Sequence, residues 1–231
     1  MYSNKQIARL AGIGYLIIFI TGIFANFFVI ESMVVADDPA ATVNNIINGE
    51  SLFRIGLLSF FIMVICDVFL AWALYVILKS VDNLLSLLSG WLRLVNSTIF
   101  AFALYHLMMI LQLLNGAGYL DVFTPGQLNA QVMLSLGAFN NIWLIGLVFF
   151  GLHLFILAHL IYYSGFIPKF IGVLLAIAAA GYLADSFAHF MLENYDDYKK
   201  IFMIIVVVPG IIGELSLTLW LLIKNSRVPE I

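Results

Sequence analysis

The sequence has few charged residues for its length. Of its 231 residues, 10% are Asp, Glu, Lys or Arg, whereas 64% are hydrophobic. In a soluble domain about a quarter of all residues are charged, because a fold of this size needs a polar surface around its core. The ten basic and thirteen acidic side chains are too few to make that surface. The composition therefore excludes a soluble protein and indicates an integral membrane protein.

Other absences exclude further classes of protein. The only cysteine is Cys66, so an intrachain disulfide is impossible. The net charge is −3 and no run of Lys and Arg occurs, which argues against nucleic acid as a partner. The sequence also lacks a glycine-rich phosphate loop, a nucleophile-elbow serine and a cysteine pair for zinc. No soluble catalytic domain is expected.

Long apolar runs are what the sequence has instead. A transmembrane helix needs roughly 20 mainly apolar residues to cross about 30 Å of hydrocarbon. Six stretches meet this requirement, at residues 10–30, 55–78, 89–113, 138–163, 167–191 and 201–223. We expect an all-α, polytopic membrane protein in which residues 1–231 form a single domain of six transmembrane helices.

Two connections carry clear helix-start signals. Asp38 followed by Pro39 predicts the N-cap and first position of a short interfacial helix. Thr124-Pro125-Gly126-Gln127 has the pattern of a capping box. A helix from there to Tyr163 would be about 58 Å long at 1.5 Å per residue. We therefore expect a separate interfacial turn before the fourth span and a bend near Gly137.

The basic residues predict the orientation, because short cytoplasmic segments hold more Lys and Arg. If the N-terminus is inside, the outer side keeps three of them, which are Arg54, Lys199 and Lys200. The inner side then collects seven: Lys5, Arg9, Lys79, Arg93, Lys169, Lys224 and Arg227. Arg93, Lys79 and Lys169 are assigned to orientation and to contact with anionic membrane lipid, and Arg54 to a surface pair with Glu50. We expect a protein of the inner (plasma) membrane with both termini in the cytoplasm.

Polar side chains at membrane depth are costly, at about 2.5–3.5 kcal/mol for a charged one, and are functional candidates by default. Asp67, His153 and Glu214 fall near the midpoints of their spans, and His153 has the depth to be the partner of Glu214. Glu214 follows Pro209 and two glycines, where a kink would open a cavity. The candidates for ligand binding are Asp67, His153, Glu214, Asn140 and Asn141.

A second polar layer lies toward the outer leaflet. Asp185 and His189 are spaced i, i+4 and so share one helix face. With His106 they suit a site for a divalent metal such as zinc. The alternative is that Asp185 hydrogen-bonds His189 or His106 and holds the third and fifth helices together. The sequence makes no cofactor certain.

Several blocks of sequence resemble a known family. Gly151-Leu152-His153-Leu154, with residues 164–169 (SGFIPK) and Gly181-Tyr182-Leu183, is the most specific part. Residues 9–12 (RLAG), 67–70 (DVFL) and 219–222 (LWLL) extend the likeness over nearly the whole chain. The chain resembles the bacterial family catalogued as domain of unknown function 4386. This resemblance implies a compact multi-pass helical domain of bacterial origin, implies no activity, and favours the layer of Asp67, His153 and Glu214.

Three functions remain open from the sequence. The first is a membrane module that binds a lipidic or small ligand, or a partner helix, in an intramembrane polar cavity. The second is a membrane-embedded hydrolase, metal-dependent through His106, Asp185 and His189 or His153, with Asp67 or Glu214 as base. The third is a proton-coupled transporter that uses Glu214 and His153. We favour the binding module, because the polar layers lack a convincing nucleophile.

Overall fold

The computed structural model describes residues 3–224 and 228–229, apart from the side chain of residue 196. Within this part of the chain all regular structure is helical and no strand occurs. The elements are α1 (Asn4–Ile23), η1 (Phe24–Ile30), α2 (Glu31–Met33), α3 (Pro39–Asn48), α4 (Glu50–Leu78), α5 (Asn83–Leu113), η2 (Gly118–Leu120), α6 (Pro125–Tyr163), α7 (Lys169–Met191) and α8 (Tyr195–Ile223).

Among the residues that the structure describes, six helical stretches are long and apolar enough to cross a membrane, which confirms the predicted fold class. They are Asn4–Met33, Glu50–Leu78, Asn83–Leu113, Pro125–Tyr163, Lys169–Met191 and Asp197–Ile223. The first combines α1, η1 and α2, and η1 is a π-helical segment where ordinary helix was predicted. Val29 of η1 packs closely on α4, since a Cβ added at Gly56 would lie 2.7 Å from its Cγ1.

The predicted interruption before the fourth span is wrong. α6 is one helix of 39 residues, about 58 Å long by the helical rise. The sequence contains no proline within the helix after Pro125. The space beside Gly137 is open, because a Cβ added there would meet no atom within 4 Å. The helix therefore continues through the position at which hydrophobic thickness alone predicted a break.

The predicted helix starts are confirmed. Thr124 N donates to Gln127 Oε1 at 2.8 Å, and Gln127 N donates to Thr124 Oγ1 at 3.3 Å, so the capping box closes. The Asp38 carboxylate accepts from the backbone N–H of Ala41 at 2.9 Å, with Pro39 at the first helical position. The predicted surface pair also forms, with 2.7 Å between Arg54 Nε and Glu50 Oε1.

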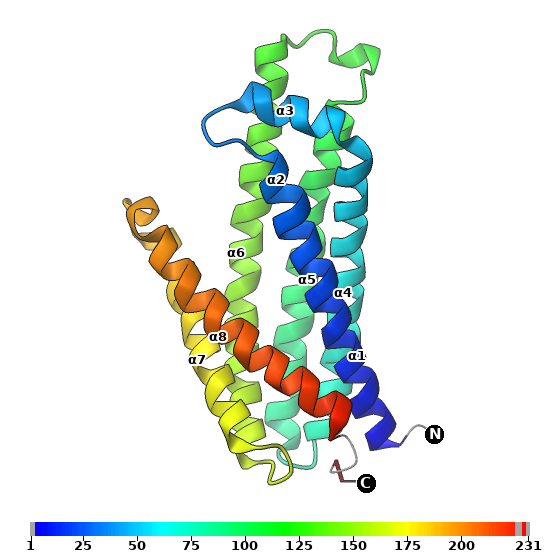
Figure 1. Cartoon of the computed structure of the whole chain (residues 1–231), viewed down its shortest axis with the longest axis vertical. Helices are drawn as coiled ribbons and strands as arrows, with labels where there is room; N and C mark the ends of the chain where they lie inside the picture. The colour runs from blue at the N-terminus through cyan, green and yellow to red at the C-terminus, as the bar shows by residue number, and fades with distance from the viewer. Residues whose placement is uncertain (1–2, 225–227, 230–231) are drawn as a thin grey trace. The chain divides into compact units, whose positions relative to one another are not determined.

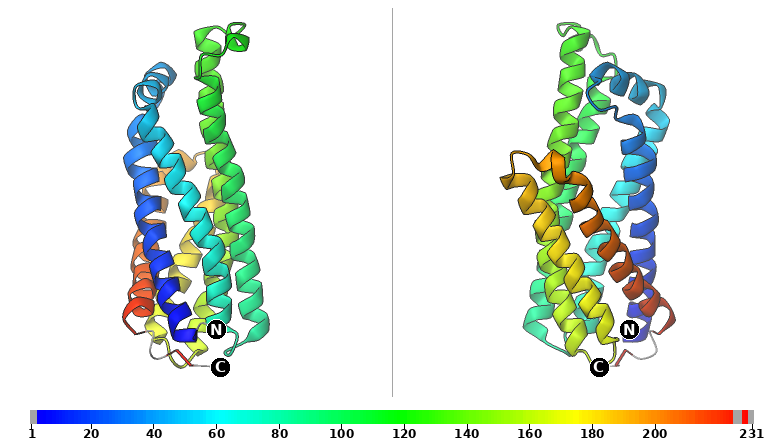
Figure 2. Two further views of the ribbon diagram at one scale, coloured as in Figure 1. Left: turned by 90° about the vertical axis from the view of Figure 1, so that its right-hand side faces the viewer. Right: turned by 60° about the vertical axis from the view of Figure 1, so that its left-hand side comes forward.

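The chain divides into two compact units. The first comprises Met1–Leu16, Cys66–Ser97 and Leu144–Ile231. Within it α7 and α8 run side by side, as Figures 1 and 2 show in yellow and in orange to red. Glycines set the close spacing, because a Cβ added at Gly181 would lie 2.6 Å from the Ile205 carbonyl oxygen. A Cβ at Gly172 would likewise lie 2.8 Å from the Ala158 oxygen.

The second unit comprises Ile17–Ile65 and Thr98–Trp143. Its core contains aromatic rings around Trp143, whose ring centroid lies 3.7 Å from that of Phe100 and 5.2 Å from that of Phe60. In this unit α3 lies across the end of α2 (Figure 1). The Asn45 amide fixes that turn by donating to the Met33 carbonyl at 3.1 Å.

Candidate functional site

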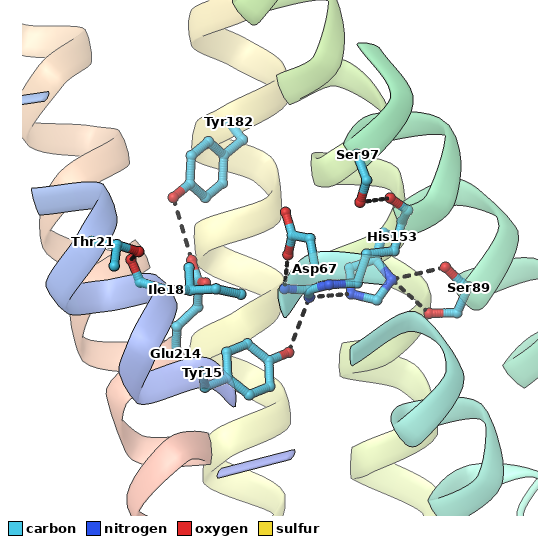
Figure 3. A network of polar contacts seen from close by, with 10 residues as sticks. Tyr15, Ile18, Thr21, Asp67, Ser89, Ser97, His153, Tyr182 and Glu214 are labelled. Atoms are coloured by element: carbon cyan, nitrogen blue, oxygen red, sulfur yellow. Dashed lines mark hydrogen bonds and ion pairs between the residues drawn. The ribbon is translucent and has the colours of Figure 1, made fainter. Parts of the chain in front are cut away.

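A network of buried polar side chains lies in the first unit (Figure 3). The printed bonds of this network converge on Arg93 of α5. The Arg93 side chain is 1% exposed. Its Nη2 forms an ion pair with Asp67 Oδ1 of α4. Its Nη1 donates to Tyr15 Oη of α1 at 3.1 Å and to His153 Nε2 of α6 at 3.0 Å. Four helices therefore meet at one guanidinium group.

Small residues bring these helices close enough for the network to form. A Cβ added at Gly90 of α5 would lie 3.3 Å from the Ala71 carbonyl oxygen of α4. A Cβ at Gly14 of α1 would lie 3.4 Å from the Leu70 side chain of α4. Close approach through small residues is how transmembrane helices associate. It lets the short Asp67 side chain reach Arg93.

The assignment of Arg93 to orientation and lipid contact is wrong. Its charge is compensated inside the protein by Asp67, and its remaining donors on Nη1 find Tyr15 and His153. Two aromatic rings also flank it, with the guanidinium carbon 5.0 Å from the Tyr15 ring centroid and 5.5 Å from that of Phe150. Such cation–π contacts favour a buried cation. With Arg93 removed from the count, the predicted inner side still holds more basic residues than the outer side.

The hydrogen bonds of His153 define its tautomer. Arginine has no acceptor, so His153 Nε2 must accept the bond from Arg93 Nη1. The proton is then on Nδ1, which lies 2.9 Å from both the carbonyl oxygen and the hydroxyl of Ser89. His153 is thus a neutral imidazole with both ring nitrogens engaged.

Glu214 of α8 is the second buried acid of the first unit, and its side chain lies beside Tyr182 in Figure 3. The Tyr182 hydroxyl of α7 donates to Glu214 Oε1 at 3.3 Å. Gly210 makes room for this hydroxyl, because a Cβ there would lie 3.1 Å from it. The predicted pairing of Glu214 with His153 does not occur among the hydrogen bonds of the described residues, since the ring nitrogens of His153 bond to Ser89 and Arg93.

Hydrogen-bonding capacity remains along the buried face of α5. In the described part of the chain, Arg93 Nε, Ser86 Oγ and both amide atoms of Asn96 have no hydrogen-bond partner. These residues follow one another at helical spacing with Ser89, and all are buried. Buried polar atoms are normally paired. The side chains of Ser86, Arg93 and Asn96 therefore have unused capacity to form hydrogen bonds with a small polar group.

Two other ligand-binding candidates, Asn140 and Asn141, belong to the second unit, where both are exposed. Among the metal candidates, Asp185 accepts a hydrogen bond of 2.6 Å from the Tyr195 hydroxyl of α8. The His189 ring contacts the same tyrosine edge-on, with 4.5 Å between centroids. His106, in the second unit, contacts Phe102 and Tyr105.

No three His, Cys, Asp or Glu residues gather as a metal site among the residues that the structure describes. The metal assignment of His106, Asp185 and His189 stays a prediction. Metal analysis of the purified protein, with activity or stability measured before and after chelation, tests it.

The sequence interpretation missed the residues that complete the network, namely Tyr15, Ser89, Arg93 and Tyr182. For Arg93 a signal was present. Residues 86, 89, 93 and 96 are Ser, Ser, Arg and Asn, at steps of three, four and three. That spacing places all four on one helix face, and a polar face in an otherwise apolar span points inward.

Comparison with known proteins identifies the family. The family described as "Domain of unknown function (DUF4386)" matches residues 10–225. An uncharacterized protein of Archaeoglobus fulgidus is 31% identical over 171 residues, which cover 74% of this chain and 84% of that protein. No solved structure matches the chain. The bacterial origin stays a prediction. The match over nearly all of the chain, together with six apolar helices, shows that this multi-pass membrane protein belongs to the DUF4386 family.

Proposed function

We propose that the protein binds a lipidic or small ligand within the membrane, through a cationic or hydrogen-bond-donating group that meets Glu214. The observation that carries this proposal is the isolation of the Glu214 carboxyl group. The residue is 8% exposed, and among the described residues its carboxyl group takes part in one hydrogen bond, a long one of 3.3 Å from the Tyr182 hydroxyl. A carboxyl group at membrane depth needs a stronger partner than one neutral hydroxyl.

The charges of the neighbouring network support the same proposal. Asp67 compensates Arg93, and His153 is neutral in the tautomer that its hydrogen bonds define. The network of the first unit thus has two buried acids, Asp67 and Glu214, and one buried cation, Arg93. Glu214 is the acid that no cation of the network compensates. A site with an excess acid favours a cation, or a neutral donor when the acid is protonated. The unpaired atoms of Asn96 and Arg93 offer further bonds to a polar ligand.

Of the alternatives, hydrolysis has less support. Asp67 Oδ1 is engaged by Arg93, and His153 uses both ring nitrogens within the protein. A general base must be free to take a proton from its substrate. Proton-coupled transport has one specific observation in its favour, which is again Glu214. Buried acids of this kind are typical of proton relays in transporters.

A binding experiment tests the role of Glu214. The purified full chain is titrated with hexadecylamine, hexadecanol and palmitate, which share one alkyl chain and differ in the charge of the head group. We expect the amine to raise the unfolding temperature most. Saturation at 100 times Kd is worth about 2.7 kcal/mol, and each kcal/mol shifts Tm by roughly 2–4 °C at this chain length. The isosteric variant Glu214→Gln should lose most of that shift.

The matched control is Glu50→Gln, which neutralises an exposed acid in a surface pair. It should respond to the amine as the native protein does. If the three compounds stabilise the protein equally, or if Glu214→Gln and Glu50→Gln respond alike, the proposed ligand group at Glu214 is wrong.

We also propose that the chain lies in the plasma membrane with both termini in the cytoplasm. Cys66 is the only cysteine, so a Cys66→Ala background permits single-cysteine labelling. In intact cells a membrane-impermeant maleimide should label Glu50→Cys, and should label Lys79→Cys only after permeabilisation. The reverse pattern would overturn the orientation. Arg227, which was counted on the inner side, lies outside the described residues.

A further inference from the structure

A cavity of the first unit lies between the last turns of α6 and the first turns of α7. Its volume is about 220 Å³. Gly172, which lines the cavity, lets α6 and α7 approach closely. A Cβ added there would lie 2.8 Å from the Ala158 carbonyl oxygen. We call this cavity the α6–α7 groove. Its lining includes Phe155, His159, Tyr162, Tyr163, Val173 and Ala176.

The groove is polar at one end and apolar at the other. His159, Tyr162 and Tyr163 line it at the C-terminal end of α6, and Lys169, the first residue of α7, holds its Nζ 5.0 Å from the Tyr162 ring centroid. Phe155 lies eight residues before Tyr163, about 12 Å deeper by the helical rise. Amphipathic aromatic rings of this kind occupy the headgroup level of a membrane.

The hairpin formed by α6 and α7 carries a positive charge where the two helices connect, and no acidic residue near that connection in the sequence balances it. Between Asp121 and Asp185 the sequence contains no Asp or Glu, and Lys169 is the only Lys or Arg in that interval. The structure shows no carboxylate paired with Lys169 among the described residues. At the start of α7 the N-cap is Pro168, which supplies no side-chain cap. The positive end of the helix dipole therefore adds to the charge of Lys169.

We propose that the α6–α7 groove binds an anionic phospholipid. The phosphate lies at Lys169 and His159, the glycerol region lies against Tyr162 and Tyr163, and the first part of one acyl chain lies along Phe155 and Val173. Charge complementarity selects this occupant, because a basic and acid-free headgroup end meets an apolar end in one continuous groove. The proposal does not depend on Glu214 or on the function proposed for it.

Native mass spectrometry of the full chain tests the proposal. The protein is exchanged into phosphatidylglycerol or phosphatidylcholine with identical acyl chains, and the lipids retained after activation are counted. We expect phosphatidylglycerol to be retained more strongly. One Lys near an anionic surface contributes about 1 kcal/mol, so Lys169→Ala should weaken retention about fivefold and leave phosphatidylcholine unchanged.

Two variants separate the groove from general electrostatics. Lys79→Ala, at the end of α4, removes an equal charge elsewhere and should retain phosphatidylglycerol as the native protein does. Val173→Trp fills the apolar end at an exposed position and should reduce retention with Lys169 intact. Inorganic phosphate should not displace the lipid. Equal retention of the two lipids, or equal effects of Lys169→Ala and Lys79→Ala, would overturn the proposal.

Discussion

Replacing Asp67 by alanine is expected to destabilise the protein by about 3–5 kcal/mol, the cost of removing one partner of a buried ion pair. The effect is large because Arg93 is 1% exposed and cannot reach water when its partner is lost. Its bonds to Tyr15 and His153 would remain, but both are neutral groups. A denaturant titration of each variant in mild detergent measures the change in the free energy of unfolding.

The chain provides a matched control in its surface pair. Glu50 and Arg54 form an ion pair as well, at 2.7 Å between residues spaced i, i+4 on α4, but their side chains are 53% and 59% exposed. Glu50→Ala should cost about 0.3–0.5 kcal/mol. The double variant Asp67→Leu/Arg93→Leu should be more stable than Asp67→Ala, because it removes both charges together. If Asp67→Ala costs no more than Glu50→Ala, the buried ion pair is not a determinant of the fold.

The same ion pair shows why the site was only partly predictable from the sequence. Asp67, His153 and Glu214 are predictable as site residues, because the neighbouring sequence is enough to recognise a polar residue within an apolar run. Arg93 lies near the start of its span, where a basic residue ordinarily faces the headgroups. Its burial depends on which helices surround it. That information comes from the small residues, such as Gly90, that bring α4 and α5 together.

The six spans, by contrast, were predictable because hydropathy over about 20 residues is a local property. The extent of α6 was not. The prediction placed an interruption before the fourth span because a helix from Pro125 to Tyr163 exceeds the hydrocarbon thickness. The capping box at Thr124 starts the helix and no later residue stops it. Bilayer thickness limits the apolar part of a helix, whereas the helix itself ends only where its backbone is interrupted.

Gly181→Ala should destabilise the protein by about 1–3 kcal/mol, the usual cost of overpacking, although alanine is the better helix former. An added Cβ at Gly181 would lie 2.6 Å from the Ile205 carbonyl oxygen. That atom belongs to the α8 backbone, so relief requires α7 and α8 to move apart. The control is Gly137→Ala in α6, where a new Cβ meets nothing within 4 Å. There the gain in helix propensity should stabilise the protein by up to about 1 kcal/mol.

The two substitutions are chemically identical, so opposite signs in the free energy of unfolding would isolate the close approach of α7 and α8. Equal signs would show that this approach is not tight. The spacing also bears on the candidate site, because Tyr182 follows Gly181 on α7 and bonds to Glu214 on α8. Widening the two helices lengthens a bond that is already 3.3 Å. Gly181→Ala should therefore also alter the stabilisation by hexadecylamine, whereas Gly137→Ala should leave it unchanged.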